Sequence, residues 1–360
     1  MTCLILGGGV AGLTAARAVR ERDGACQMVM LTAEPRAPYI RPLLSKAAFG
    51  GLNPARISLD TAGLNLELHT DCKVLRIDTS CRRVFSTAGD FGYDACVYAM
   101  GAHSFMPDFP GSQQGHVLRC TEDFFAIKRA LPRSFTAAIV GGGVIGVEMA
   151  WLLRERGLSV RILELAPRLM PRQLDDEASA LVCRLLESRG IEVETGVSLK
   201  EAPSADILVV SCGIRPNDEI AKAAGITLAI DEHMATDIPG VYACGDCVGA
   251  GLYTVAEEQG RVAGANAAAF AQGLEGTDVC RPVCRDLLLH LGGPGVFATG
   301  RITQDAKTQA VGKSPLFRVN PGWQGDTFRR TFYDGGKPVG GVIVGDLSAA
   351  AQLRRDLACG

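Results

Sequence analysis

The strongest constraint on the fold is a pattern of strand, glycine turn and helix that occurs twice in the sequence. The first copy, CLILGGGVAGLTAARAVRER (3–22), begins as a short apolar strand and continues into an alanine-rich helix. The second copy is AAIVGGGVIGVEMAWLLRERG (137–157). The G-x-G-x-x-G glycines are Gly7, Gly9 and Gly12 in the first copy, and Gly141, Gly143 and Gly146 in the second.

Each glycine of this motif has a separate physical task. The first permits the tight turn, the second lets a pyrophosphate approach the backbone, and the third lets the helix pack on the strand. Free N–H groups and the positive end of the helix then hold the phosphates. Two copies predict two dinucleotide sites, most simply for FAD and NADH. The alternative is a pair of tight glycine turns in an α/β protein that binds neither.

An acidic residue follows the second strand of each unit. Glu34 ends MVMLTAE (28–34) and Glu164 ends SVRILE (159–164). A carboxylate at this place accepts hydrogen bonds from a ribose, and at Glu164 it would repel the additional phosphate of NADPH. Arg168 lies four residues further on and could offset that repulsion. The sequence therefore favours NADH, with NADPH as the less favoured cofactor.

Composition excludes several classes of protein. The chain has 360 residues, 47% of them hydrophobic, and a net charge of −2, which suits two or three globular domains and argues against a nucleic-acid or membrane-surface binder. The most apolar window (137–153) carries Glu148 and is short for a membrane span. The N-terminus lacks the basic region of a secretory signal, and the thirteen cysteines are scattered, so a reducing cytoplasm is expected.

The sequence resembles the pyridine nucleotide–disulfide oxidoreductase superfamily, and within it the NADH:rubredoxin oxidoreductases and the FAD/NAD region of NADH-dependent nitrite reductases. The similar stretches include EPRAPYIRPLLSK (34–46), GGGVIGVEMA (141–150), ELAPRLMPRQLD (164–175), SCGIRPND (211–218), IDEHMATDIPGVYACGD (230–246) and AEEQGRVAGANAA (256–268). The resemblance implies an α/β fold with two Rossmann-like, glutathione-reductase-type dinucleotide-binding domains and a small α+β C-terminal domain. The expected limits are 1–107 with 217–273 for FAD, 108–216 for NADH and 274–360 for the C-terminal domain.

The resemblance also implies further cofactor-binding residues. Thr236, the strand VYAC and Gly245-Asp246 would form the second half of the FAD site, with the Asp246 carboxylate on the ribityl or pyrophosphate end. Arg41 would meet the FAD phosphates or adenine. Glu258 and Gln259 would begin a helix directed at the flavin pyrimidine ring, and Gly213 would contribute to the cofactor site. The alternatives are a surface arginine at Arg41 and simple helix capping by Glu258 and Gln259.

Cys244 and Cys247 bracket Asp246 at a spacing that is also typical of a redox dithiol or half of a zinc site. A cofactor-bound aspartate between them would restrict a disulfide, and no second C-x-x-C or histidine pair is close enough to complete a zinc site. We therefore expect neither, and no metal, although a dithiol remains the alternative.

The residues expected at the flavin contain no thiol. The stretch PYIRPLLSKAAF (38–49) has no cysteine, whereas disulfide reductases of the family carry a C-x-x-x-x-C pair in this region, and NADH peroxidases and coenzyme A disulfide reductases carry a single cysteine. The resemblance instead places Lys46 beside the flavin, paired with Glu148, where a cation stabilises the charge of the reduced ring. The alternatives are an exposed helix lysine and a glutamate on a solvated helix face. Hydride transfer needs no protein acid or base, so we expect Lys46 and Glu148 to act through charge and orientation.

The resulting prediction is an FAD-dependent NADH oxidoreductase that passes electrons to a small carrier protein, either rubredoxin or a ferredoxin-like protein. Alternatives are the electron-input component of an NADH-dependent nitrite reductase, an NADH oxidase that uses O₂, and a redox-sensing flavoprotein with negligible turnover. The stretch PVCRDLLLHLGG (282–293) lacks the aromatic motif of ring-dioxygenase ferredoxin reductases, which counts against that class. The chain is expected to be a monomer or a homodimer.

Overall fold

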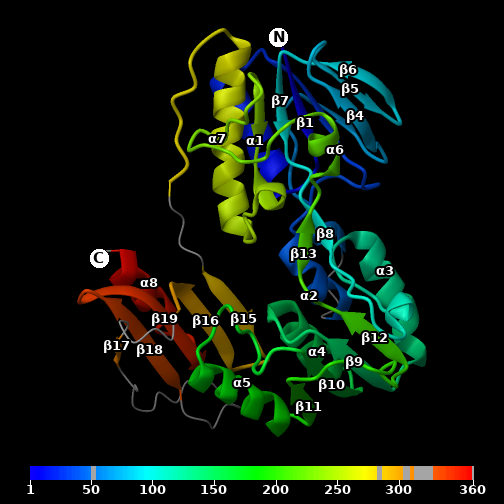
Figure 1. Ribbon diagram of the computed structural model, residues 1–360, viewed down its shortest axis with the longest axis vertical. Coiled ribbons are helices and arrows are strands. Elements are labelled where there is room, and N and C mark those ends of the chain that lie inside the picture. The colour runs from blue at the N-terminus through cyan, green and yellow to red at the C-terminus, as the bar shows by residue number, and fades with distance from the viewer. Residues whose placement is uncertain (50–53, 282–285, 303–308, 312–326, 359–360) are drawn as a thin grey trace. The chain divides into compact units, whose positions relative to one another are not determined.

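Figure 1 shows the computed structural model, which describes residues 1–49, 54–281, 286–302, 309–311 and 327–358. The chain divides into two compact units. The first comprises Met1–Leu44, Asn53–His103 and Ile214–Val283, and the second comprises Ser45–Leu52, Ser104–Gly213 and Cys284–Gly360. The second unit therefore contains both the predicted NADH domain and the C-terminal region, together with the segment that carries Lys46. The predicted limits of three separate domains remain a prediction.

The first unit is built on a five-stranded parallel sheet. Its central strand, β1, is buried along four of its five residues, as expected of a parallel strand covered on both faces. In the register, Leu4 pairs with Val29 on one side and with Cys96 on the other. The strand order is β14 (Val241–Ala243), β7 (Ala95–Tyr98), β1 (Thr2–Leu6), β2 (Gln27–Leu31) and β3 (Leu66–His69).

Two helices of the first unit, α1 (Val10–Arg22) and α7 (Tyr253–Ala271), pack side by side (Figure 1). Their contact face consists of alanine and glycine, and a Cβ at Gly260 or Gly264 would overlap the backbone of Ala11 or Ala15. Small residues thus let the helix backbones approach closely. The unit also contains α6 (Glu219–Ala223) and a three-stranded antiparallel sheet of β4 (Val74–Asp78), β5 (Arg83–Ser86) and β6 (Gly89–Gly92).

The second unit contains a four-stranded parallel sheet in the order β11 (Ile191–Thr195), β10 (Ser159–Glu164), β9 (Thr136–Val140) and β12 (Ile207–Val210). Besides this sheet, the unit contains α2 (Leu44–Phe49), α3 (Thr121–Ala130), α4 (Val144–Glu155) and α5 (Asp176–Ser188). The short strands β8 (Ala102–Ser104) and β13 (Ile214–Pro216), where the chain passes between the units, pair with each other. The predicted α/β fold with two Rossmann-like sheets is confirmed.

The C-terminal region forms an antiparallel sheet and a final helix, which confirms the predicted α+β character. The sheet order is β15 (Leu287–His290), β16 (Gly295–Gly300), β19 (Lys337–Gly345), β18 (Phe328–Asp334) and β17 (Gln309–Val311), and α8 (Ala350–Ala358) follows. The small core between sheet and helix includes Phe297, Ile343 and Leu353. Within the described residues, the search for a helix with the length and hydropathy of a membrane span finds none.

Candidate functional site

The two glycine turns follow β1 and β9 and have the same geometry. The first glycine of each has a positive φ, +116° at Gly7 and +104° at Gly141, which side-chain-bearing residues rarely adopt. A Cβ at Gly12 would overlap the carbonyl oxygen of Gly7, and one at Gly146 would overlap that of Gly141. The fold itself therefore requires the first and third glycines.

The second glycines, Gly9 and Gly143, differ because a Cβ at either position would meet no atom within 4 Å. They are the N-cap residues of α1 and α4, where no side chain caps the helix and the first turn has no acidic residue. Open space beside free N–H groups at a positive helix end fits a diphosphate. The residues present at both turns therefore fit a dinucleotide.

Gly213 lies in the same region of the second unit, three residues beyond the end of β12. Its φ is +101°, a Cβ there would meet no atom within 4 Å, and its carbonyl oxygen accepts a hydrogen bond from the Phe105 N–H at 2.9 Å. Ser211, two residues earlier, lies against Gly141. Gly213 therefore follows a strand end that packs against the second glycine turn, which is compatible with its expected role.

Glu34 lies three residues beyond β2 and already has two partners within the chain. The phenol of Tyr39 donates to its carboxylate at 2.5 Å, and the Arg41 guanidinium forms an ion pair with it. Arg41 was expected to meet the FAD phosphates or adenine; the structure pairs it with Glu34, and its contact with FAD remains a prediction. Tyr39 is a buried member of this cluster that the sequence did not single out.

Glu164 is the last residue of β10, and its carboxylate accepts hydrogen bonds from the backbone N–H groups of Gly142 and Ala166. The acid is thereby held directly at the second glycine turn. Arg168 forms an ion pair with Asp176 at 3.0 Å and donates to the carbonyl oxygen of Pro171 at 3.2 Å. Both Nη atoms are thus engaged by neighbouring protein groups, while the buried Nε atom has no hydrogen-bond partner in the described part of the chain.

Lys46 and Glu148 lie in the second unit and form the expected ion pair. The Lys46 Nζ atom is 3.0 Å from Glu148 Oε1, and their side chains are 40% and 12% exposed. Lys46 comes from α2 and Glu148 from the second turn of α4, which starts at the second glycine turn. Ser45 also belongs to this cluster, because its hydroxyl donates to Glu148 Oε2 at 2.7 Å. The sequence pattern did not indicate this contact.

The Gly245-Asp246 turn follows β14. Gly245 has a φ of +85°, and its N–H donates to Gln259 Oε1 at 2.9 Å, while Asp246 Oδ1 accepts from the Gly251 N–H at 3.0 Å. The Thr236 hydroxyl donates to the carbonyl oxygen of Val241 at 2.8 Å, at the start of the same strand. Gln259 therefore supports the turn on which Asp246 is placed.

The expected start of the helix at Glu258 and Gln259 is wrong, because α7 begins at Tyr253. Gly249 and Gly251 have positive φ values of 83° and 67°, so the chain turns there and the helix can begin directly afterwards. Packing of α7 on α1 outweighs the weaker intrinsic helix preference of Tyr253, Thr254 and Val255. Glu258 and Gln259 therefore lie in the second turn of the helix.

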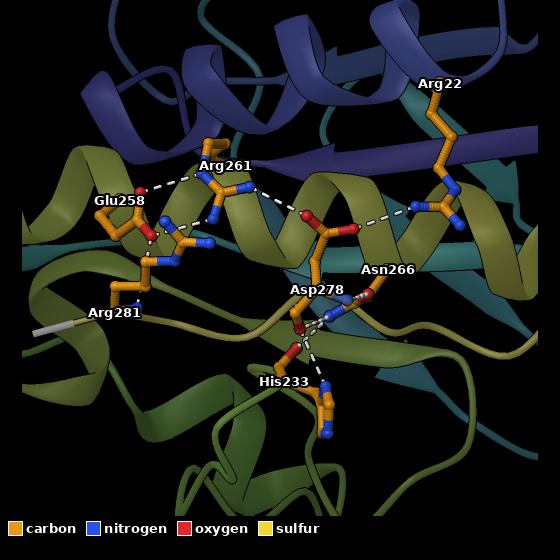
Figure 2. A network of polar contacts seen from close by, with 7 residues as sticks. All are labelled: Arg22, His233, Glu258, Arg261, Asn266, Asp278 and Arg281. Atoms are coloured by element: carbon orange, nitrogen blue, oxygen red, sulfur yellow. Dashed lines mark hydrogen bonds and ion pairs between the residues drawn. The ribbon is translucent and has the colours of Figure 1, made fainter.

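Figure 2 shows where Glu258 is directed. Its carboxylate accepts two hydrogen bonds from Arg261, each 2.9 Å long, and Arg261 continues to Asp278 at 3.0 Å. Arg261 holds the pKa of Glu258 below its usual range. The network fastens the segment around Asp278 to α7. A role for Glu258 at the flavin remains a prediction.

Cys244 and Cys247 are both free, buried thiols. Cys244 belongs to the core cluster that includes Met30, and Cys247 to a separate cluster that includes Tyr98. The Cys247 thiol donates to the carbonyl oxygens of Cys244 at 3.1 Å and Tyr98 at 3.4 Å. Burial raises the pKa of Cys247 to about 11 and that of Cys244 well above its usual range. No grouping of three potential metal ligands occurs among the residues that the structure describes.

The chain matches the family described as "Pyridine nucleotide-disulphide oxidoreductase" over residues 1–260. It is 29% identical to an NADH oxidase of Methanocaldococcus jannaschii, covering 98% of this chain and 89% of that protein. A nitrite reductase of Bacillus subtilis is 28% identical over 97% of this chain, which spans only 46% of the nitrite reductase. The NADH:rubredoxin oxidoreductase of Clostridium acetobutylicum has a similar fold, with a TM-score of 0.82, 23% identity, and coverage of 100% and 96% of the two chains.

The ferredoxin–NAD(+) reductase subunit of a Pseudomonas putida benzene 1,2-dioxygenase system is 30% identical, over 88% of this chain and 86% of its own. The missing aromatic motif therefore does not separate this chain from such reductases, contrary to expectation. The motif is a short local signal, whereas this similarity extends over most of the chain. Its expected place begins at 282–285, outside the described residues.

Proposed function

Because this chain belongs to the pyridine nucleotide-disulphide oxidoreductase family, we propose that it is an FAD enzyme that oxidises NADH and reduces a small iron–sulfur protein. The coarser activity, that of an NAD(P)H-dependent flavin oxidoreductase, follows from the family and from the relatives. The observation that carries the finer proposal is the Lys46–Glu148 pair, whose lysine lies in a stretch (38–49) without cysteine.

Each group of residues has a separate task in this proposal. The Gly7–Gly12 turn and Asp246 bind FAD, while the Gly141–Gly146 turn and Glu164 bind NADH. FAD held by these residues would supply the chemistry of accepting a hydride and releasing two electrons singly. Glu148 holds the Lys46 ammonium in place, and the ammonium supplies positive charge for the reduced cofactor. Cys244 and Cys247 have no task in this proposal, because both thiols are buried and burial raises their pKa values.

The engagement of Arg168 supports the preference for NADH. A guanidinium that binds a 2′-phosphate must be available to it, and here Asp176 and the Pro171 carbonyl already engage Arg168. Glu164, held at the glycine turn, adds negative charge where that phosphate would lie. Both features favour the cofactor without the phosphate.

The acceptor is proposed from the relatives. A reductase of a dioxygenase ferredoxin system and a reductase of rubredoxin are both similar to this chain, and both of these acceptors are small one-electron proteins. We take rubredoxin as the first acceptor to test and a [2Fe–2S] ferredoxin as the second.

The test is an anaerobic titration of the FAD-loaded protein with NADH, followed through the flavin spectrum. We expect two electrons per FAD, no long-wavelength thiolate-to-flavin band, and fast reoxidation by rubredoxin or ferredoxin. Uptake of four electrons per FAD would instead show an active dithiol and would overturn the proposal. Turnover that is negligible with every acceptor would favour a redox-sensing flavoprotein.

A second candidate is an NADH oxidase, which the similarity to the Methanocaldococcus jannaschii protein favours. Without a cysteine in 38–49, direct reaction with O₂ is expected to give hydrogen peroxide rather than water. An aerobic rate that exceeds the rates with both carrier proteins would make this the leading function.

A further inference from the structure

The carboxylate of Glu148 is held by two donors, one on each oxygen. Lys46 Nζ lies 3.0 Å from Oε1, and the Ser45 hydroxyl lies 2.7 Å from Oε2. The two donors are consecutive residues of α2, whose side chains leave a helix about 100° apart. They therefore enclose the carboxylate from two directions.

The two donors differ in how firmly they are fixed. Ser45 is only 4% exposed and has a short side chain, whereas the Lys46 side chain is long and 40% exposed. A carboxylate held through one oxygen by a flexible ammonium can still rotate, whereas a second, buried donor fixes its plane. Ser45 thus determines the orientation of Glu148, and Glu148 in turn determines where the ammonium is held.

We propose that Ser45 is a positioning residue for flavin reduction, acting through Glu148 on Lys46. This inference rests on the proposed function, in which Lys46 supplies charge to the reduced cofactor. It assigns Ser45 a different task from the residues that bind NADH, because the second glycine turn and Glu164 hold that cofactor. Loss of the hydroxyl should consequently change the rate of hydride transfer and leave NADH affinity almost unchanged.

The variant that tests this is Ser45→Ala, which removes one oxygen and leaves the volume of the site nearly unchanged. In rapid mixing with NADH we expect the limiting rate of flavin reduction to fall about tenfold or more, the scale of one hydrogen bond to a charged group. The dissociation constant for NADH should remain within about twofold of wild type on the same scale. The matched control is Ser134→Ala, because the Ser134 hydroxyl donates to the Ala130 carbonyl at 3.0 Å in the same unit.

A double-mutant cycle with Glu148→Met, which removes the carboxylate that accepts from Ser45, separates positioning from a general loss of stability. If Ser45 acts through Glu148, Ser45→Ala should have little further effect on the limiting rate in the Glu148→Met background. Urea unfolding of the same four proteins should show the same lack of additivity, which provides a readout that does not depend on turnover.

A limiting rate for Ser45→Ala within twofold of wild type, or equal losses in both backgrounds, would overturn the inference. A variant that loses stability yet keeps the wild-type limiting rate would make Ser45 merely structural and would also overturn it. Failure of the proposed function looks different, since the wild-type protein itself would then not be reduced by NADH.

Discussion

At the residue scale, the glycines of the second glycine turn differ in whether an added methyl group would lower stability or NADH affinity. Gly143 has a φ of −75°, which alanine adopts readily, and a Cβ there meets no protein atom within 4 Å. We expect Gly143→Ala to keep its melting temperature and FAD content but to bind NADH about tenfold more weakly or worse, since the methyl group occupies the phosphate space. Titration with NADH measures this loss.

The matched variant is Gly146→Ala, whose Cβ would overlap the Gly141 carbonyl oxygen and lie 2.6 Å from the Ser211 hydroxyl oxygen. Overpacking of this kind costs about 1–3 kcal/mol or more, so this variant should lose thermal stability. Wild-type NADH affinity in Gly143→Ala would show that the second turn is not the NADH site.

The thiols of Cys244 and Cys247 should be inert in the folded protein. Because burial raises the pKa of Cys247 to about 11, about one molecule in a thousand carries its thiolate at pH 8. Iodoacetamide at pH 8 should therefore label exposed Cys81 and leave both buried thiols unmodified, and labelling of Cys247 should rise only as the pH approaches its pKa. Peptide mass spectrometry measures this, and a peptide cross-linked through Cys244 and Cys247 after oxidation would restore the dithiol hypothesis.

The charge of Glu164 should contribute to cofactor choice. Glu164→Gln keeps an oxygen that can accept from the Gly142 N–H and removes the negative charge that repels a 2′-phosphate. The ratio of kcat/KM for NADPH to that for NADH should rise about tenfold, mainly through KM for NADPH. If the ratio is unchanged, the discrimination resides elsewhere in the loop.

At the scale of elements, Arg330 joins the C-terminal sheet to helix α5 of the same unit. It pairs from β18 with Asp175, the buried N-cap of α5, and with Glu177. Removing one partner of a buried pair leaves an uncompensated charge, so Arg330→Met should lower the free energy of unfolding by about 2–4 kcal/mol. The control is Arg329→Met, whose partner Asp356 is 41% exposed and whose loss should cost about 1 kcal/mol or less. Equal losses in urea unfolding would contradict this account.

The elements that the sequence predicted well are those whose cause is local. A glycine turn between an apolar strand and a helix is encoded within about twenty residues, so both copies appear where the motif places them. The start of α7 was misplaced because packing between α1 and α7 decides it. Ser45 was missed because its partner Glu148 lies 103 residues away in the sequence, and no local pattern joins the two. The pairing of Arg41 with Glu34 was missed for the same reason, since it depends on the path of the loop after β2, and contact of Arg41 with FAD remains a prediction.

At the scale of the whole molecule, the net charge of −2 is too small to attract an acceptor from a distance. We expect recognition of a carrier protein to depend on local charges that are paired across the contact. Such contacts are weakened by salt, whereas the reaction of a flavin with O₂, a neutral molecule, is not.

We therefore expect kcat/KM for rubredoxin or ferredoxin to fall several-fold between about 0.05 M and 0.5 M NaCl, while the rate of flavin reduction by NADH changes little. The reaction with O₂, measured over the same salt series, is the internal control. A carrier-protein rate that is independent of salt and slower than the O₂ rate would remove the case for a protein acceptor. The NADH oxidase hypothesis would then account for the glycine turns, the Lys46–Glu148 pair and the absence of a cysteine in 38–49 as well as the carrier-protein hypothesis does.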